Sequence, residues 1–145
     1  MRQLKYLVTP LLVVAVAVGC DNDSPTDPVV EEPEPVPTVT DTFTGSFALG
    51  EASCHVFTTV NAGPAELTIT GLAPLDTLTV GLGIGIDDGD PETACSYFAV
   101  DRSVRVAETL QSQLTAETTY CVCVFDVGNV FPDQTVDYTL DVEHP

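Results

Sequence analysis

Between residues 41 and 145 the chain consists of short segments in which apolar and polar side chains alternate, and this pattern constrains the fold most strongly. The segments are rich in Thr, Val, Phe and Tyr, and alternation with a period of two is typical of strands with one buried face. Clusters of Gly, Pro, Asn and Asp between them predict turns. We therefore predict an all-β fold, an antiparallel β-sandwich or barrel with about eight strands and almost no helix.

The alternation also predicts where strands lie and which side chains are buried. The expected strands cover residues 42–49, 54–60, 65–71, 77–86, 97–100, 104–110, 118–127 and 135–142. In the strand at 118–127 we expect Tyr120, Val122 and Val124 to face the core and Cys121, Cys123 and Phe125 to face the opposite side. Residues expected to be largely buried are Val60, Leu67, Ile69, Val122, Val124, Leu140 and Val142.

Several of these segments carry short motifs. They are Phe43-Thr44-Gly45, Leu67-Thr68-Ile69-Thr70, the run from Leu114 to Val124, and the closing Tyr138-Thr139-Leu140-Asp141-Val142. Together they resemble the bacterial pre-peptidase C-terminal (PPC) domain, although Glu117 stands where that family has Gly. The resemblance implies a jelly-roll-like sandwich attached to secreted enzymes or surface proteins, with no catalysis by the domain itself.

The first twenty residues have the features of an export signal. Arg2 and Lys5 precede an apolar run over 11–19, which is too short to span a bilayer because a span needs about 20 residues. Ala17-Val18-Gly19-Cys20 resembles a bacterial lipobox, in which the Cys becomes the lipidated first residue. We predict a signal peptide over 1–19 and a lipid on Cys20 that holds the protein to a membrane of the bacterial cell envelope. The alternative is an ordinary signal peptide with a free thiol nearby.

Residues 20–40 interleave Pro with Asp and Glu, which predicts an extended tether in front of the domain at 41–145. The chain has 22 Asp and Glu against 4 Lys and Arg, and cleavage would leave Arg102 and Arg105 as the only cations of these two types. Such a surface repels phosphate backbones, so nucleic acid is excluded as a partner. It also repels anionic lipid headgroups, so the lipid itself must anchor the protein.

Four cysteines remain after Cys20, and an even number in an exported domain predicts two disulfides. Cys121 and Cys123 share one face of a strand with parallel side chains, so they should not pair with each other. Each should pair with Cys54 or Cys95, which leaves two connectivities open. A metal or redox site built from the same cysteines and His55 is the alternative, but Cys-x-Cys is not a usual zinc spacing.

The loop Asp87-Asp88-Gly89-Asp90-Pro91-Glu92 places four carboxylates around a Gly. The oxygens of Asp87, Asp88, Asp90 and Glu92 are ligands that suit calcium. The loop lacks the order of an EF-hand, and the alternative is a solvated turn in an acidic protein. No other cofactor is indicated.

Catalytic residue patterns are weak. The histidines are His55, expected to face solvent on a strand, and His144 beside the last residue, and neither Gly-x-Ser-x-Gly nor His-Glu-x-x-His occurs. We therefore expect no enzyme but a non-catalytic envelope lipoprotein whose sandwich is a structural module or binds a protein or matrix partner. A calcium-dependent binding domain is the alternative, and a hydrolase that uses a pair of carboxylates is the remote one.

Overall fold

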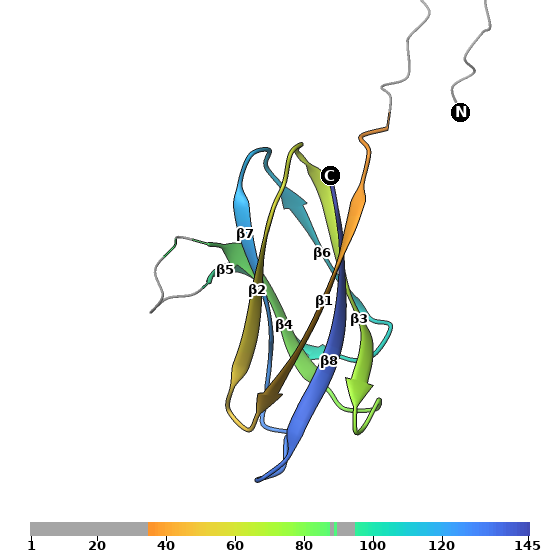
Figure 1. The fold of residues 1–145 in the computed structure, drawn as a ribbon, viewed down its shortest axis with the longest axis vertical. Coiled ribbons are helices and arrows are strands. Elements are labelled where there is room, and N and C mark those ends of the chain that lie inside the picture. The colour runs from red at the N-terminus through yellow and green to blue at the C-terminus, as the bar shows by residue number, and fades with distance from the viewer. Residues whose placement is uncertain (1–34, 88, 90–94) are drawn as a thin grey trace, which may run out of the picture. The chain divides into compact units, whose positions relative to one another are not determined.

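The computed structural model describes residues 35–87, 89 and 95–145, and all of its regular elements are strands. They are β1 (Val39–Ala48), β2 (Ala52–Thr58), β3 (Gly63–Ala73), β4 (Val80–Ile86), β5 (Ser96–Val104), β6 (Thr109–Leu114), β7 (Thr119–Phe125) and β8 (Thr135–His144). They form two antiparallel four-stranded sheets, ordered β1-β8-β3-β6 and β2-β7-β4-β5, which face each other in Figure 1. Consecutive strands alternate between the sheets except for β4 and β5, which pair within one sheet. This is the strand order of a jelly roll and confirms the predicted fold class.

Large aliphatic and aromatic side chains from both sheets fill the space between them. Leu67, Ile69, Val122, Val124, Leu140 and Val142 are fully buried, as the alternation predicted. Tyr120, Val122 and Val124 belong to this core, whereas Cys121 and Cys123 form a separate buried cluster with Cys95. The predicted inward and outward sets of β7 are therefore correct.

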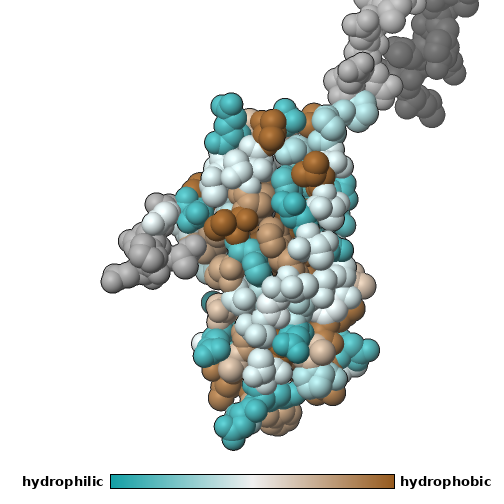
Figure 2. Space-filling model, viewed as in Figure 1, coloured by the Kyte–Doolittle hydropathy of each residue, from teal (hydrophilic) through white to brown (hydrophobic). Residues whose placement is uncertain are grey.

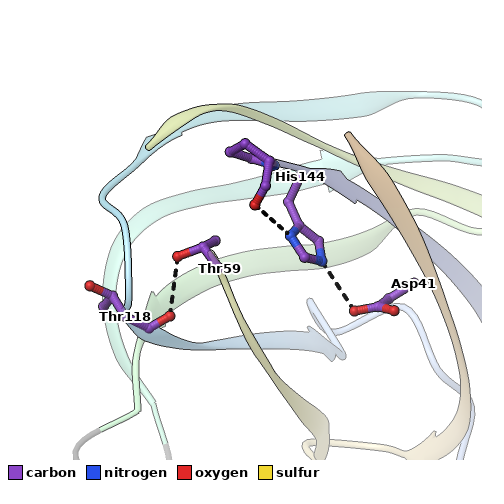
Figure 3. Close-up of polar contacts among 5 residues, drawn as sticks. Asp41, Thr59, Thr118 and His144 are labelled. Carbon is purple, nitrogen blue, oxygen red and sulfur yellow. Dashed lines mark hydrogen bonds and ion pairs between the residues drawn. The ribbon is translucent and has the colours of Figure 1, made fainter. Parts of the chain in front are cut away.

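Val60 is an exception, because 74% of its surface is exposed where burial was expected. Strand β2 ends at Thr58, and the buried residue that follows is Thr59. The Thr59 hydroxyl donates hydrogen bonds to the carbonyl oxygens of Thr115, at 2.7 Å, and Thr118, at 3.3 Å. Figure 3 shows the bond to Thr118. These bonds hold the end of β2 against the turn before β7, and Val60 lies in the turn that follows.

The predicted strand at 104–110 is wrong, because Val104 ends β5, residues 105–108 form a turn, and Thr109 begins β6. The backbone N–H of Glu108 donates to the Arg105 carbonyl oxygen at 3.0 Å, and the Glu108 carboxylate accepts from the Arg105 N–H at 2.8 Å. Ala107 has a positive φ of 68°, which breaks the extended backbone. The sequence pattern at Val104, Val106 and Glu108 therefore resembles that of a strand, although the chain turns between β5 and β6 here.

The first and last strands lie side by side, with β1 at the edge of its sheet. Val39 is opposite His144, so β1 begins two residues before the expected domain start at 41. His144 is buried, and its Nε2 lies 3.1 Å from Asp41 Oδ2 (Figure 3). The ring centroid of His144 lies 4.6 Å from that of Phe57. The last residues of the chain are thus held to β1 by a polar contact as well as by the strand ladder.

Candidate binding surface

The outer face of the β2-β7-β4-β5 sheet, called here the disulfide face, carries an unusual set of residues. Its outward positions are Cys54, Val56, Gly81, Gly83, Gly85, Tyr97, Val100, Cys121, Cys123 and Phe125. Val56 is 56% exposed, Tyr97 43% and Val100 42%. The outer face of an antiparallel sheet is normally polar, so exposed apolar side chains here need an explanation.

Both disulfides lie on this face and use one of the two connectivities left open by the sequence. Cys54 pairs with Cys123, which lies directly opposite on the neighbouring strand β7, with 4.1 Å between their Cα atoms. Cys95 pairs with Cys121, although β4 lies between β5 and β7. Gly85 of β4 is the register partner of Cys121 and has no side chain, so this bridge can cross β4.

Strand β4 has glycine at each outward position, and neighbouring side chains cover these glycines. A Cβ atom on Gly81 would collide with the Phe125 ring, and one on Gly83 would lie 2.8 Å from Tyr97 Cε1. The two rings are 6.3 Å apart between centroids. Burial raises the pKa of the Tyr97 hydroxyl above its ordinary value. The glycines thus allow two aromatic rings to lie against the backbone of β4.

A hollow of about 280 Å³ lies at one end of this face and is called here the Tyr97 hollow. Its apolar lining is Ala52, Tyr97, Val100 and Phe125, and its charged lining is Glu51, Arg102 and Asp126. Recesses with aromatic lining and a few charged groups are typical of sites that receive a side chain of a partner.

Asp126 fixes the backbone around the hollow. Its carboxylate accepts hydrogen bonds from the N–H groups of Gly50, Gly128, Asn129 and Val130 at 2.9 to 3.2 Å. Burial opposes ionisation of Asp126, but the four N–H groups together lower its pKa below the ordinary value. The carboxylate thus joins the turn between β1 and β2 to the loop between β7 and β8.

The outer face of the β1-β8-β3-β6 sheet, called here the threonine face, is mostly polar. Its outward residues include Thr40, Thr42, Thr44, Glu66, Thr68, Thr70, Gln111, Asp137, Thr139, Asp141 and Glu143, and none of its four strands contains Lys or Arg. A groove of about 370 Å³ on this face is lined partly by Glu66 and Glu143. Both carboxylates already accept a hydrogen bond, from Gln111 and Thr38 respectively.

His55 is half-buried and not fully exposed to solvent, which corrects the sequence interpretation. It points between the sheets, where its ring stacks on Phe43 at 4.8 Å and its Nε2 lies 2.8 Å from the Tyr138 hydroxyl. Tyr138 in turn bonds to Ser53 Oγ at 2.9 Å. Burial lowers the pKa of His55 below its ordinary value. Neither the Tyr97 hollow nor the groove on the threonine face is lined by these four residues, so the cluster joins the sheets without opening into either recess.

Some predicted site residues lie outside the described residues, namely Cys20, the signal peptide, Asp88, Asp90 and Glu92. Asp87 is described, and its Oδ1 accepts a hydrogen bond from the Gly89 N–H at 3.0 Å. Within residues 35–87, 89 and 95–145, no three His, Cys, Asp or Glu side chains are grouped so that they could share a metal ion. In the same ranges, no helix is long and apolar enough to cross a membrane.

The sequence did not single out Tyr97, Val100 and Phe125 as binding residues, because aromatic and aliphatic side chains in strands usually fill the core. The glycines at 81, 83 and 85 were a signal that could have found them. Alternate glycines in a strand leave one face of its backbone bare, and neighbouring side chains can then lie on that face.

Comparisons with known proteins show a similarity in fold. No protein-family model matches the chain, and no curated protein matches it. Among solved structures, it resembles the crystal structure of Aeromonas hydrophila PliG, a periplasmic lysozyme inhibitor of g-type lysozyme. The TM-score is 0.52 at 13% sequence identity, and the match covers 71% of this chain and 83% of that chain. At this identity, the similarity shows that the two proteins share a β-rich fold.

Proposed function

We propose that this protein is a non-catalytic, lipid-anchored module of the cell envelope whose β-sandwich binds a protein partner. The observation that carries the proposal is the disulfide face, where Val56, Tyr97 and Val100 are exposed on a rigid sheet. Apolar side chains that remain exposed together on a folded domain are typical of protein interaction sites. By contrast, the outward residues of the threonine face are mostly polar.

The location outside the cytoplasm is supported by two independent features. Two disulfides persist in an oxidising compartment, and PliG, which has a similar fold, is described as periplasmic. The lipobox-like sequence ending at Cys20 and the acidic tether behind it support anchoring through lipid. We also infer that the sandwich is a divergent PPC-like domain, on the motifs over 114–124 and 138–142.

Anchoring is tested by fractionating cells that make the protein. The wild type should sediment with membranes, and Cys20→Ser should move it to the soluble fraction. Intact-mass analysis of the wild type should show an acylated Cys20 as the first residue. A soluble wild type, or an unmodified Cys20 in the mature protein, would contradict the anchor.

Protein binding is tested first with g-type lysozyme, because PliG is described as an inhibitor of that enzyme. The mature protein with Cys20→Ser is titrated against the enzyme while heat of binding and lysis of cell walls are followed. We expect a one-to-one complex with Kd below about 1 µM and loss of lysis. The protein alone should release no product from cell walls. Absence of both binding and inhibition would exclude this enzyme as the partner.

A further inference from the structure

The disulfide face is fixed in shape before any partner arrives. Cys54–Cys123 ties β2 to β7, Cys95–Cys121 crosses β4, and the rings of Tyr97 and Phe125 lie over the glycines of β4. Asp126 fixes the loops beside the Tyr97 hollow through four backbone N–H groups. A surface that loses little conformational freedom on binding gives more affinity for the same contacts.

The charge of the chain limits what can cover this face. The chain has 22 Asp and Glu residues, and beyond Arg2 and Lys5 its Lys and Arg residues are Arg102 and Arg105 alone. A second copy of the chain would add an equal number of carboxylates, and the tether at 20–40 is itself acidic. Both are therefore repelled by the domain, whereas a positively charged protein is attracted over several ångströms.

We propose that the Tyr97 hollow is the anchor point for a basic protein, which inserts an apolar side chain between Tyr97, Val100 and Phe125. This inference rests on the proposed function and names the partner's chemistry. The exposed Glu51 carboxylate at the hollow accepts one hydrogen bond, from the Ala48 N–H to its Oε2 at 3.1 Å, and its Oε1 faces the partner's Lys or Arg. Asp126 is already occupied by four backbone N–H groups. Arg102 is the only cation that lines the hollow, and it opposes the partner's charge.

The face and the partner are tested by photo-crosslinking in the cells that naturally make the protein. A photoreactive amino acid is placed at Val56 or Val100 on the disulfide face, and at Thr44 or Thr70 as matched positions on the threonine face. We expect crosslinks from positions 56 and 100 to one protein, identified by mass spectrometry, whose sequence has a net positive charge. Positions 44 and 70 should give none.

The purified pair then gives a quantitative test. Val100→Asp should weaken binding by about 30-fold or more. Thr70→Asp adds the same charge to the other face and should change the affinity by less than about threefold. Arg102→Glu removes a positive charge that opposes the partner, so this variant should associate with the partner faster than the wild type. Added salt screens the attraction and should slow association. Circular dichroism and melting show whether the Val100→Asp variant is folded. If this variant is unfolded, Val56→Asp is used in its place.

The opposite results overturn the inference in distinguishable ways. Crosslinks from 44 and 70 alone, or equally from all four positions, leave protein binding intact but place it elsewhere. Crosslinks from positions 56 and 100 to a second copy, to the tether or to an acidic protein would show that the partner is not the basic protein proposed here. Weaker binding of the partner by the Arg102→Glu variant would show the same. No crosslink from any of the four positions would contradict both this inference and the proposed function.

Discussion

The two outer faces of this sandwich are built by the same strand geometry but from opposite kinds of residue. The threonine face has polar side chains at its outward positions, and its carboxylates bond to Thr and Gln neighbours, as in the pairs Thr42–Asp141 and Gln111–Glu66. The disulfide face has cysteine, glycine and apolar residues, and two covalent bridges replace hydrogen-bonded pairs. The difference shows that one face interacts with water through polar side chains, whereas the other is held by covalent bridges and exposes apolar side chains.

The largest expected effect is on stability when a bridge of the disulfide face is removed. Cys54→Ala with Cys123→Ala should lower the free energy of unfolding by about 4 kcal/mol, because the bridge closes a loop with a sequence separation of 69 residues. Thr42→Ala with Asp141→Ala removes a matched cross-strand pair on the threonine face and should cost about 1 kcal/mol or less. Urea unfolding measures both. Equal losses of unfolding free energy in the two double variants would show that the bridge stabilises the fold no more than the cross-strand pair on the threonine face does.

The glycines give the next largest effect. A Cβ on Gly85 would collide with the backbone carbonyl of Ser96, which cannot move without shifting β5, so Gly85→Ala should cost about 2 kcal/mol or more. Gly71 on the threonine face has ordinary space, with Thr139 Oγ1 3.5 Å from the new Cβ. Gly71→Ala should leave the urea midpoint unchanged or raise stability by up to about 1 kcal/mol. A harmless Gly85→Ala would contradict the role given to the β4 glycines.

The contribution of His55, which lies between the two sheets, to the stability of the fold is expected to depend on pH. Burial holds the pKa of His55 below its ordinary value of 6.5, so the unfolded chain binds more protons than the folded one in the window just below that value. The contribution of His55 to stability is therefore present above pH 6.5 and is lost as the pH falls through the folded-state pKa. Melting temperatures of the wild type should fall between pH 7 and pH 5 relative to those of His55→Gln. Parallel pH profiles for the two proteins would show that His55 is not the group responsible.

The smallest expected effect on stability comes from the exposed apolar residues. Val56→Thr should change the free energy of unfolding by no more than about 0.5 kcal/mol, since Val56 is largely exposed. The same change should shorten retention on a hydrophobic interaction column, and Thr44→Val on the threonine face should lengthen it. A large loss of stability in Val56→Thr would mean that the fold itself requires this valine, which would weaken the case for a binding surface.

Local sequence pattern predicted the fold because alternation is a property of each strand alone. The buried phase of β7 and the opposite placement of Cys121 and Cys123 followed from that alternation. The same reasoning failed at Val60 and at 104–110, where contacts between distant residues decide where a strand ends. The Thr59 hydroxyl bonded to the turn before β7 is such a contact, and so is the Ala107 N–H bonded to the Ile69 carbonyl oxygen at 2.8 Å.

The sequence by itself determined an all-β sandwich with two disulfides that avoid a Cys121–Cys123 bridge, because side chains two residues apart on a strand point the same way. Only the tertiary structure decided which bridges form, since that depends on β2 lying beside β7 and on Gly85 lying under the path from Cys95 to Cys121. It also turned His55 inward toward Tyr138 and left Val56, Tyr97 and Val100 exposed together. Strand order brings distant segments onto one face, and alternation within a single strand carries no information about that order.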